Sequence, residues 1–218
     1  MKVYIISFKK EGVWNELMPF SKHRFKKLGY NVKVINGYNM KEHPEIKTNQ
    51  IVYLNVRDKV LPQAKRDNNE EGFFIAEDDA FPKEFLTKDF LLERMKLEKY
   101  DYKNTILRIG YQKKLKQKGA SYPLGYYLVG SQLTWIPSSL LDKLINHMND
   151  KRPQHLNGYF SKLKPNELKI GILDEEEQKG KGNKYVDEFE HSSSILPGGK
   201  VRKGLKLNKT KVSVSPKN

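Results

Sequence analysis

Residues 73–79 read Phe-Phe-Ile-Ala-Glu-Asp-Asp, four apolar side chains followed at once by three carboxylates. A continuous apolar run of this length is typical of a strand that is buried on both faces of a sheet. The three acids then mark the point where the strand reaches the edge of the sheet. Residues 3–7, Val-Tyr-Ile-Ile-Ser, form a second run of the same kind. The two runs therefore predict two buried strands.

Helical patterns separate these strands. Leu17, Phe20, Phe25 and Leu28 share one helical stripe, and Gly29 supplies a stop. The strand–helix–strand–helix–strand order of the first 80 residues favours an α/β fold with a mixed, mostly parallel central sheet flanked by helices. The predicted strands are 3–7, 32–35 (closed by Asn36-Gly37), 73–76, 105–109, 126–129, 133–136 and 168–173, and the predicted helices are 17–28, 51 to the 66–69 region, a segment after Pro82, and 137–148.

The composition limits the class of protein and the kinds of site. The chain has 218 residues, no cysteine, and a formal net charge of +15 from 41 basic and 26 acidic side chains. The lack of cysteine excludes disulfides, zinc–thiolate sites and a cysteine nucleophile. The apolar runs are far shorter than the roughly 20 residues of a membrane span. We expect a cytoplasmic protein with no membrane span, whose basic surface favours phosphates and other polyanions.

One domain and a tail are expected. Residues 174–184 contain no apolar side chain and predict an exposed loop. From Lys200 onward the chain carries seven basic residues and no acid. These features place a single domain at residues 1–196 and a basic, partly disordered tail at residues 197–218.

The acidic triplet Glu77-Asp78-Asp79 is the main candidate site. Ligands of open α/β sheets bind outside the carboxyl ends of the strands, where this triplet is predicted to lie. If the chain stays extended, residues 77 and 79 point the same way. Their oxygens suit a hard divalent ion such as Mg²⁺ or Mn²⁺, which takes one or two carboxylates together with phosphate oxygens. A solvated loop that caps the next helix is an equally acceptable interpretation of the triplet alone.

Three blocks in a particular order resemble a known family. They are residues 1–7, residues 73–80, and Gly125-Tyr-Tyr-Leu-Val-Gly-Ser131 followed by a predicted helix. Together they are similar to nucleotide-sugar glycosyltransferases of the GT-A fold. Within that fold, residues 1–196 resemble the amino-terminal glycosyltransferase domain that large algal viruses encode to decorate their capsid protein. More distantly, they resemble the lipopolysaccharide and procollagen galactosyltransferase group with its acidic signature.

The resemblance implies a metal site and a donor. The triplet stands in for the family's Asp-x-Asp motif, with Asp79 as the main ligand of Mn²⁺ or Mg²⁺, Asp78 on the ribose or the ion, and Glu77 outside the ligand shell. His191 is in the place where such enzymes often complete the coordination. The donor implied is a nucleoside diphosphate sugar, with a UDP-sugar favoured, and the acceptor is a glycan or a glycoprotein. The implied location is the host cytoplasm if the chain is viral.

The resemblance also places the nucleotide along the end of the first strand. Ser7, Phe8 and Lys9 are where the fold contacts base and ribose, and Phe8 is positioned to stack on uracil or to be a core side chain. Arg57, on the helix before the third strand, has a guanidinium that can hold phosphate or base, although a solvated surface charge is the commoner role of an arginine.

The catalytic base is not identified by the sequence. The galactosyltransferase group carries a proline–aspartate pair after the helix predicted at 137–148, whereas residues 152–160 read Arg-Pro-Gln-His-Leu-Asn-Gly-Tyr-Phe with no acid. The resemblance favours inversion, which needs a carboxylate or histidine within reach of the acceptor hydroxyl. Asp142, Asp150 and Glu167 are candidates that spacing cannot rank.

Two other classes of function remain open at this stage. The net charge, the basic run at 113–118 and the tail fit a nucleic-acid-binding protein or a metal-dependent nuclease. Apart from the acids at 174–177, which are predicted to lie in an exposed loop, no second carboxylate cluster follows another predicted strand. We expect no specific nucleic acid partner. A non-catalytic module that binds nucleotide sugars is the second alternative. The sequence contains neither a P-loop nor a G-x-G-x-x-G motif.

Overall fold

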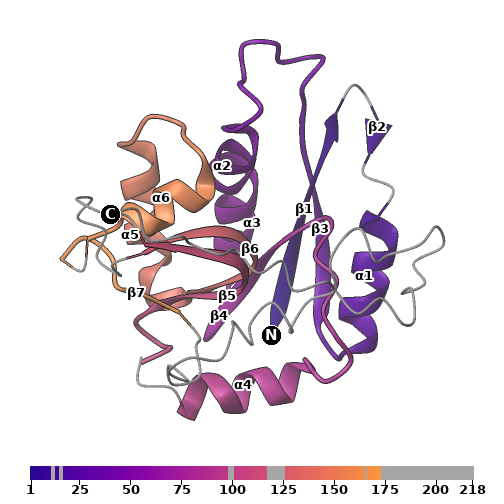
Figure 1. Ribbon diagram of the computed structural model, residues 1–218, viewed down its shortest axis with the longest axis vertical. Coiled ribbons are helices and arrows are strands. Elements are labelled where there is room, and N and C mark those ends of the chain that lie inside the picture. Colours follow the sequence, from indigo (N-terminus) through magenta and orange to yellow (C-terminus); the bar gives the residue numbers. More distant parts are fainter. Residues whose placement is uncertain (11–12, 15–16, 98–100, 117–125, 165, 173–218) are drawn as a thin grey trace, which may run out of the picture.

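The structure, a computed structural model, describes residues 1–10, 13–14, 17–97, 101–116, 126–164 and 166–172. Strands and helices alternate along this part of the chain (Figure 1). The strands are β1 (Lys2–Lys10), β2 (Val13–Trp14), β3 (Asn31–Asn39), β4 (Gly72–Glu77), β5 (Ile106–Lys116), β6 (Tyr126–Pro137) and β7 (Ile170–Ile172). The helices are α1 (Met18–Lys27), α2 (Ile51–Asn55), the π-helical turn η1 (Val56–Val60), α3 (Leu61–Arg66), α4 (Lys88–Leu97), the 3₁₀ turn η2 (Ser138–Leu140), α5 (Leu141–Asn149) and α6 (Leu156–Lys162).

The strands form one mixed sheet of seven strands. Its order runs β2-β1-β4-β6-β5-β7, and β3 pairs with β1. The pairs β1–β3, β1–β4 and β5–β7 are parallel, while β1–β2, β4–β6 and β5–β6 are antiparallel. This confirms the predicted α/β class with a mixed sheet. The first two parallel connections each pass through helices, as a crossover between parallel strands requires.

Helices cover both faces of the sheet, which explains the apolar runs of β1 and β4. Alternate residues of β1 enter different cores, with Tyr4 in one and Val3 and Ile5 in the other. The first core packs against α2, η1, α3, α5 and α6, and the second against α1 and α4. A strand that is buried on both faces has no polar-out positions, so its sequence reads as a continuous apolar run.

Of two predicted stop signals in the first half, one agrees with the structure and one differs from it. Helix α1 ends as expected, at Gly29 with φ of 87°, a left-handed conformation that favours glycine. The prediction that Asn36-Gly37 closes the second strand is wrong, because β3 continues to Asn39. Gly37 serves packing instead, since a Cβ there would lie 2.5 Å from the Nδ2 atom of Asn55.

Further corrections concern the second half. Residues 126–129 and 133–136 belong to the single strand β6 rather than to two short strands. The helix after Pro82 begins only at Lys88, and the aromatic side chains of Phe85 and Phe90 are exposed. Helix α6 was not predicted at all. The predicted loop at 174–184, the tail and the carboxyl boundary of the domain lie outside the described residues. None of the described helices has the length and apolar character that crossing a bilayer requires.

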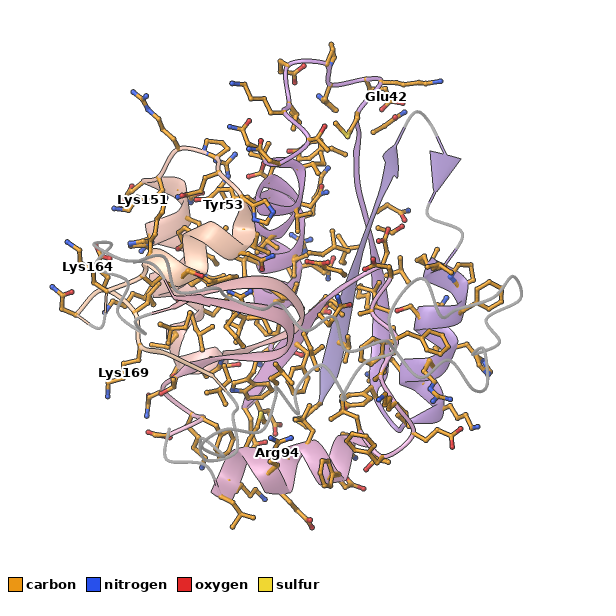
Figure 2. The ribbon with its side chains drawn as sticks, in the orientation of Figure 1. Glu42, Tyr53, Arg94, Lys151, Lys164 and Lys169 are labelled. Atoms are coloured by element: carbon orange, nitrogen blue, oxygen red, sulfur yellow. The ribbon has the colours of Figure 1, made fainter. Side chains whose placement is uncertain are left out.

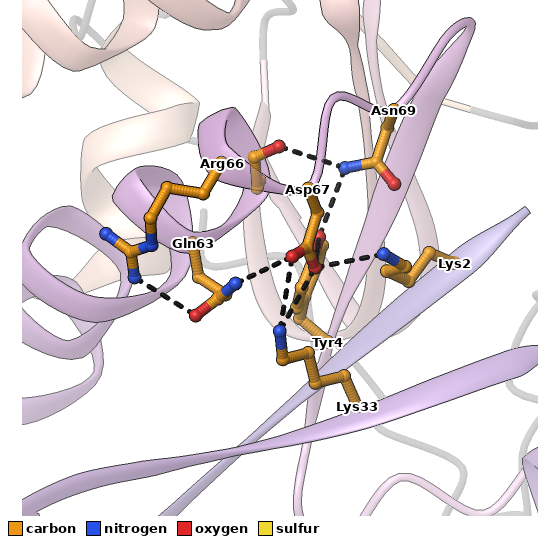
Figure 3. A network of polar contacts seen from close by, with 8 residues as sticks. Lys2, Tyr4, Lys33, Gln63, Arg66, Asp67 and Asn69 are labelled. Carbon is orange, nitrogen blue, oxygen red and sulfur yellow. Dashed lines mark hydrogen bonds and ion pairs between the residues drawn. The ribbon is translucent and has the colours of Figure 1, made fainter.

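A polar network joins the amino-terminal ends of the parallel strands (Figure 3). The carboxylate of Asp67, which follows α3, accepts hydrogen bonds from Lys2 Nζ at 2.9 Å, the Tyr4 hydroxyl at 2.8 Å and Gln63 Nε2 at 2.7 Å. Lys33 Nζ of β3 lies 3.2 Å from Oδ1 of Asp67, the oxygen that accepts from Gln63. The network therefore ties β1, β3 and α3 together at the end of the sheet opposite the acidic triplet.

Candidate functional site

The acidic triplet forms a tight turn at the carboxyl end of β4. Glu77 is the last residue of the strand, and Asp78 and Asp79 lie in the turn that follows. The Ala80 N–H donates a hydrogen bond to the Glu77 carbonyl at 3.1 Å and closes this turn. The chain thus does not stay extended, and the expectation that residues 77 and 79 alternate along a strand does not apply. The predicted position at the rim of the sheet is confirmed.

The turn is fixed to the neighbouring parallel strand. The Ser7 hydroxyl of β1 donates a hydrogen bond to Asp78 Oδ2 at 3.2 Å, and both residues are buried. Because β1 and β4 are adjacent and parallel, their carboxyl ends meet at the same edge of the sheet. Ser7 and Asp78, two of the predicted site residues, are therefore in direct contact.

Helix α1 holds the turn from the second side. The Ser21 hydroxyl donates to the carbonyl of Ala80 at 2.6 Å. Arg24 Nε donates to the carbonyl of Pro82 at 2.8 Å, and its guanidinium lies 5.3 Å from the centre of the Phe81 ring. A loop that is held by a buried serine and an arginine on one helix is more ordered than a solvated acidic loop, so the geometry favours a defined site.

Glu77 faces the core that lies under α5 and α6. In the register of β1 and β4 it pairs with Ile6, whose side chain belongs to that core. Burial raises the pKa of Glu77 to about 7, and the negative charge of Asp79 adds to this shift while the positive charge of Arg108 opposes it. Burial and a neighbouring negative charge both favour the protonated form of a carboxyl group.

Beside Glu77 the same face carries a buried polar patch, which we define as Arg108, Gln132, Thr134, Asn157 and Ser161. Arg108 of β5 pairs with Thr134 of β6, and Thr134 in turn pairs with Ile75 of β4. Arg108 Nη2 donates to Asn157 Oδ1 of α6 at 2.5 Å. This buried polar patch links α6 to the strands that end at the site.

The sequence interpretation missed the patch, although it contained a signal. Arg108 is a cation inside the apolar strand run 105–109, and it is completely buried. A buried arginine is costly unless it is paired, so its presence in a strand pattern indicates a specific partner. Its guanidinium also lies 5.3 Å from the centre of the Phe160 ring of α6, a cation–π contact between β5 and that helix.

The turn carries two carboxylates of the chemical type that binds hard divalent cations. Asp78 and Asp79 offer carboxylate oxygens at the turn, and Mg²⁺ is usually held by one or two carboxylates plus waters and substrate phosphates. Within the described part of the chain, no group of three or more His, Asp or Glu side chains is arranged to hold a metal ion. His191, the predicted additional ligand, lies outside the described residues.

The remaining predicted nucleotide contacts are not joined to the turn by the contacts described. Phe8 and Lys9 lie in β1 beyond Ser7, and their side chains fall outside the described part. Arg57 lies in η1, where Nε and Nη2 donate to the two carboxylate oxygens of Asp58 at 2.6 and 3.1 Å. Asp58 also accepts from the Tyr38 hydroxyl at 2.9 Å. The guanidinium of Arg57 is thus paired with the carboxylate of the adjacent Asp58.

The three candidate bases are placed at different points. Asp142 is exposed and pairs with Lys65 Nζ at 2.6 Å. Glu167 accepts from the Lys164 backbone N–H at 3.2 Å, and Asp150 is exposed after α5. Lys151, Lys164 and Lys169 extend outward from the side formed by α5, α6 and β7 (Figure 2).

Among known proteins, similarity to this chain is found in the solved structures. No protein-family model matches the sequence, and no curated protein matches it. Among solved structures, the chain is similar to a "crystal structure of a glycosyltransferase involved in the glycosylation of the major capsid of PBCV-1". The TM-score is 0.47 and the sequence identity 12%, over 79% of this chain and 81% of that one.

Proposed function

We propose that the protein is a metal-assisted glycosyltransferase that moves a sugar from a nucleoside diphosphate sugar, with UDP as the favoured nucleotide, to a glycan or glycoprotein acceptor with inversion at the anomeric carbon. The observation that carries this proposal is the acidic turn 77–79, anchored through Asp78 to Ser7 at the carboxyl ends of two parallel strands. Ligands of α/β sheets bind at this edge.

Two residues of the turn have a direct role in the proposal. Asp79 and Asp78 would hold Mn²⁺ or Mg²⁺, and His191 is proposed as a further ligand. Such an ion, when bound, neutralises a diphosphate leaving group. The hydrogen bond from Ser7 keeps the Asp78 carboxylate in one orientation. The nucleotide is proposed to lie along the end of β1, on Ser7, Phe8 and Lys9, with Arg57 as a more distant contact.

Calorimetry with Mn²⁺ and UDP tests the proposal. Wild type should bind UDP only when Mn²⁺ is present, and Asp79→Asn should weaken this binding at least tenfold, about 1.4 kcal/mol. Asp142→Asn is the matched control, because Asp142 is 72% exposed and its ion pair lies on another surface. His191→Ala should lower the affinity for Mn²⁺. Equal binding by wild type and Asp79→Asn, or no binding by wild type, would contradict the metal role.

Turnover separates an enzyme from a binding module. UDP release from UDP-glucose and UDP-galactose in the presence of Mn²⁺ should be measurable for wild type and lost in Asp79→Asn. Mn²⁺-dependent binding of UDP-sugars without release of UDP, over a panel of sugar acceptors, would favour the non-catalytic module instead.

A further inference from the structure

Helix α6 is connected to the acidic turn through buried charge. Arg108, Thr134 and Ile75 pair across β5, β6 and β4, so their side chains share the face of the sheet that also carries Glu77, two residues beyond Ile75. The positive charge of Arg108 acts on Glu77. At its other side Arg108 donates to Asn157 Oδ1 at 2.5 Å. Arg108 thus fixes the first turn of α6 relative to the site.

His155 stands immediately before this helix. It is the residue that caps the amino terminus of α6, and its carbonyl accepts the Tyr159 N–H at 2.9 Å. The segment that leads to it is also held, since Gln50 Nε2 donates to the carbonyl of Pro153 at 2.9 Å. The backbone of His155 is therefore fixed on both sides, while its imidazole is exposed.

The surroundings of His155 favour the neutral imidazole. Partial desolvation, followed by the positive charge of Arg108, lowers the pKa of His155 below its usual value. Of the neighbouring elements, β5 contributes Arg108, which itself acts on Glu77 of β4, and the segment before α2 contributes the neutral Gln50. On its own segment Arg152 is the nearest charged residue in the sequence. A neutral imidazole at pH 7 is the form that accepts a proton.

Two of the three acidic candidates, Asp142 and Glu167, have other partners. Asp142 pairs with Lys65, and Glu167 accepts from the Lys164 N–H. His155 is an exposed proton acceptor two residues before Asn157, which Arg108 holds on the face of the sheet that carries Glu77. We infer that His155 is the general base for the acceptor hydroxyl. This inference rests on the proposed inverting glycosyl transfer.

The donor, the acceptor and His155 supply all the atoms and electrons of the proposed step. The acceptor oxygen forms a bond to the anomeric carbon as its proton passes to an imidazole nitrogen of His155. The bond between the anomeric carbon and the diphosphate oxygen breaks, and its electron pair stays on the nucleoside diphosphate. The proton on the imidazolium is afterwards lost to solvent, which restores the neutral base.

The experiment compares His155→Gln and His155→Ala with His23→Gln, which replaces an exposed histidine on α1. The reaction followed is hydrolysis of UDP-glucose and UDP-galactose with Mn²⁺, in which water is the acceptor. Both His155 variants should lose at least about 10²-fold in kcat, the usual contribution of a general base. Their KM for the donor and their affinity for Mn²⁺ and UDP should stay within twofold of wild type. Added imidazole should restore part of the activity of His155→Ala.

The pH profile adds a readout that a structural role would not change. Wild-type kcat should fall as the pH drops through the pKa of His155, and this acid limb should disappear in His155→Gln while His23→Gln retains it. Turnover by wild type with unchanged kcat in His155→Gln would overturn the assignment and leave the proposed function intact. Equal losses of kcat and UDP affinity would overturn it in favour of a structural role. No turnover by wild type, despite binding of Mn²⁺ and UDP, would contradict the transferase proposal and the base with it.

Discussion

Replacing Asp67 by asparagine should lower the free energy of unfolding by about 2–3 kcal/mol at pH 7. A hydrogen bond to a charged group contributes about 1.5–3 kcal/mol, and Asp67 accepts from Lys2, Tyr4 and Gln63 at 2.7–2.9 Å. The sum is not additive, because Lys2 and Lys33 are 21% and 41% exposed and can be hydrated once the charge is gone. For a chain of this length the loss corresponds to a fall in Tm of roughly 4–12 °C.

The effect should depend on pH with a definite sign. Burial alone would raise the pKa of Asp67, but hydrogen bonds from Lys2, Tyr4, Gln63 and Lys33 outweigh burial and hold the pKa well below its ordinary value. Because the pKa is lower in the folded state, the stabilisation is fully present above the unfolded pKa of about 3.9. It is lost as the pH falls through the folded pKa. The difference between wild type and Asp67→Asn should therefore be constant from about pH 7 to pH 5 and shrink below about pH 4.

Urea unfolding followed by circular dichroism at several pH values measures this difference. Asp142→Asn serves as the control, since an exposed ion pair contributes about 0–1 kcal/mol and both of its partners are more than half exposed. If the two variants have the same free energy of unfolding at pH 7, or if the loss in Asp67→Asn is the same at pH 7 and pH 3, the role assigned to the network is refuted.

Two further substitutions address packing and the site. Gly37→Ala should cost about 2 kcal/mol or more in urea unfolding, since the new Cβ would lie 2.5 Å from Asn55 Nδ2; an unchanged midpoint would show that the helix moves aside freely. Ser7→Ala removes the donor to Asp78 Oδ2, and we expect the affinity for UDP with Mn²⁺ to fall about three- to tenfold, by roughly 1 kcal/mol, with little change in Tm. Wild-type affinity in that variant would separate Ser7 from the site.

The sequence predicts the elements whose pattern is local and misses those set by packing. The apolar runs at 3–7 and 73–76 and the stop at Gly29 are direct consequences of burial and backbone conformation, and all three are confirmed. Asn36-Gly37 is an equally good local turn signal, yet β3 passes through it, and the glycine leaves room for the close approach of Asn55 of α2. That close approach is a tertiary contact, which the local sequence pattern does not reveal.

The features of the candidate site also divide into those that the sequence pattern predicts and those that depend on tertiary packing. The position of Asp78 at the sheet edge follows from the strand pattern, whereas its hydrogen bond to Ser7 depends on which strands are neighbours. Arg108 is visible as an anomaly in its strand, but its partner Asn157 lies 49 residues away. Helix α6, which supplies Asn157, contains Asn and Gly near its start and so lacks a strong helical pattern.

The network around Asp67 and the acidic turn occupy opposite ends of β1. Adaptation for heat tolerance and diversification of specificity can therefore proceed in separate parts of the protein. A directed-evolution library confined to the Asp67 end is expected to raise the free energy of unfolding without the usual loss of activity. The added stability would allow destabilising substitutions around the acidic turn.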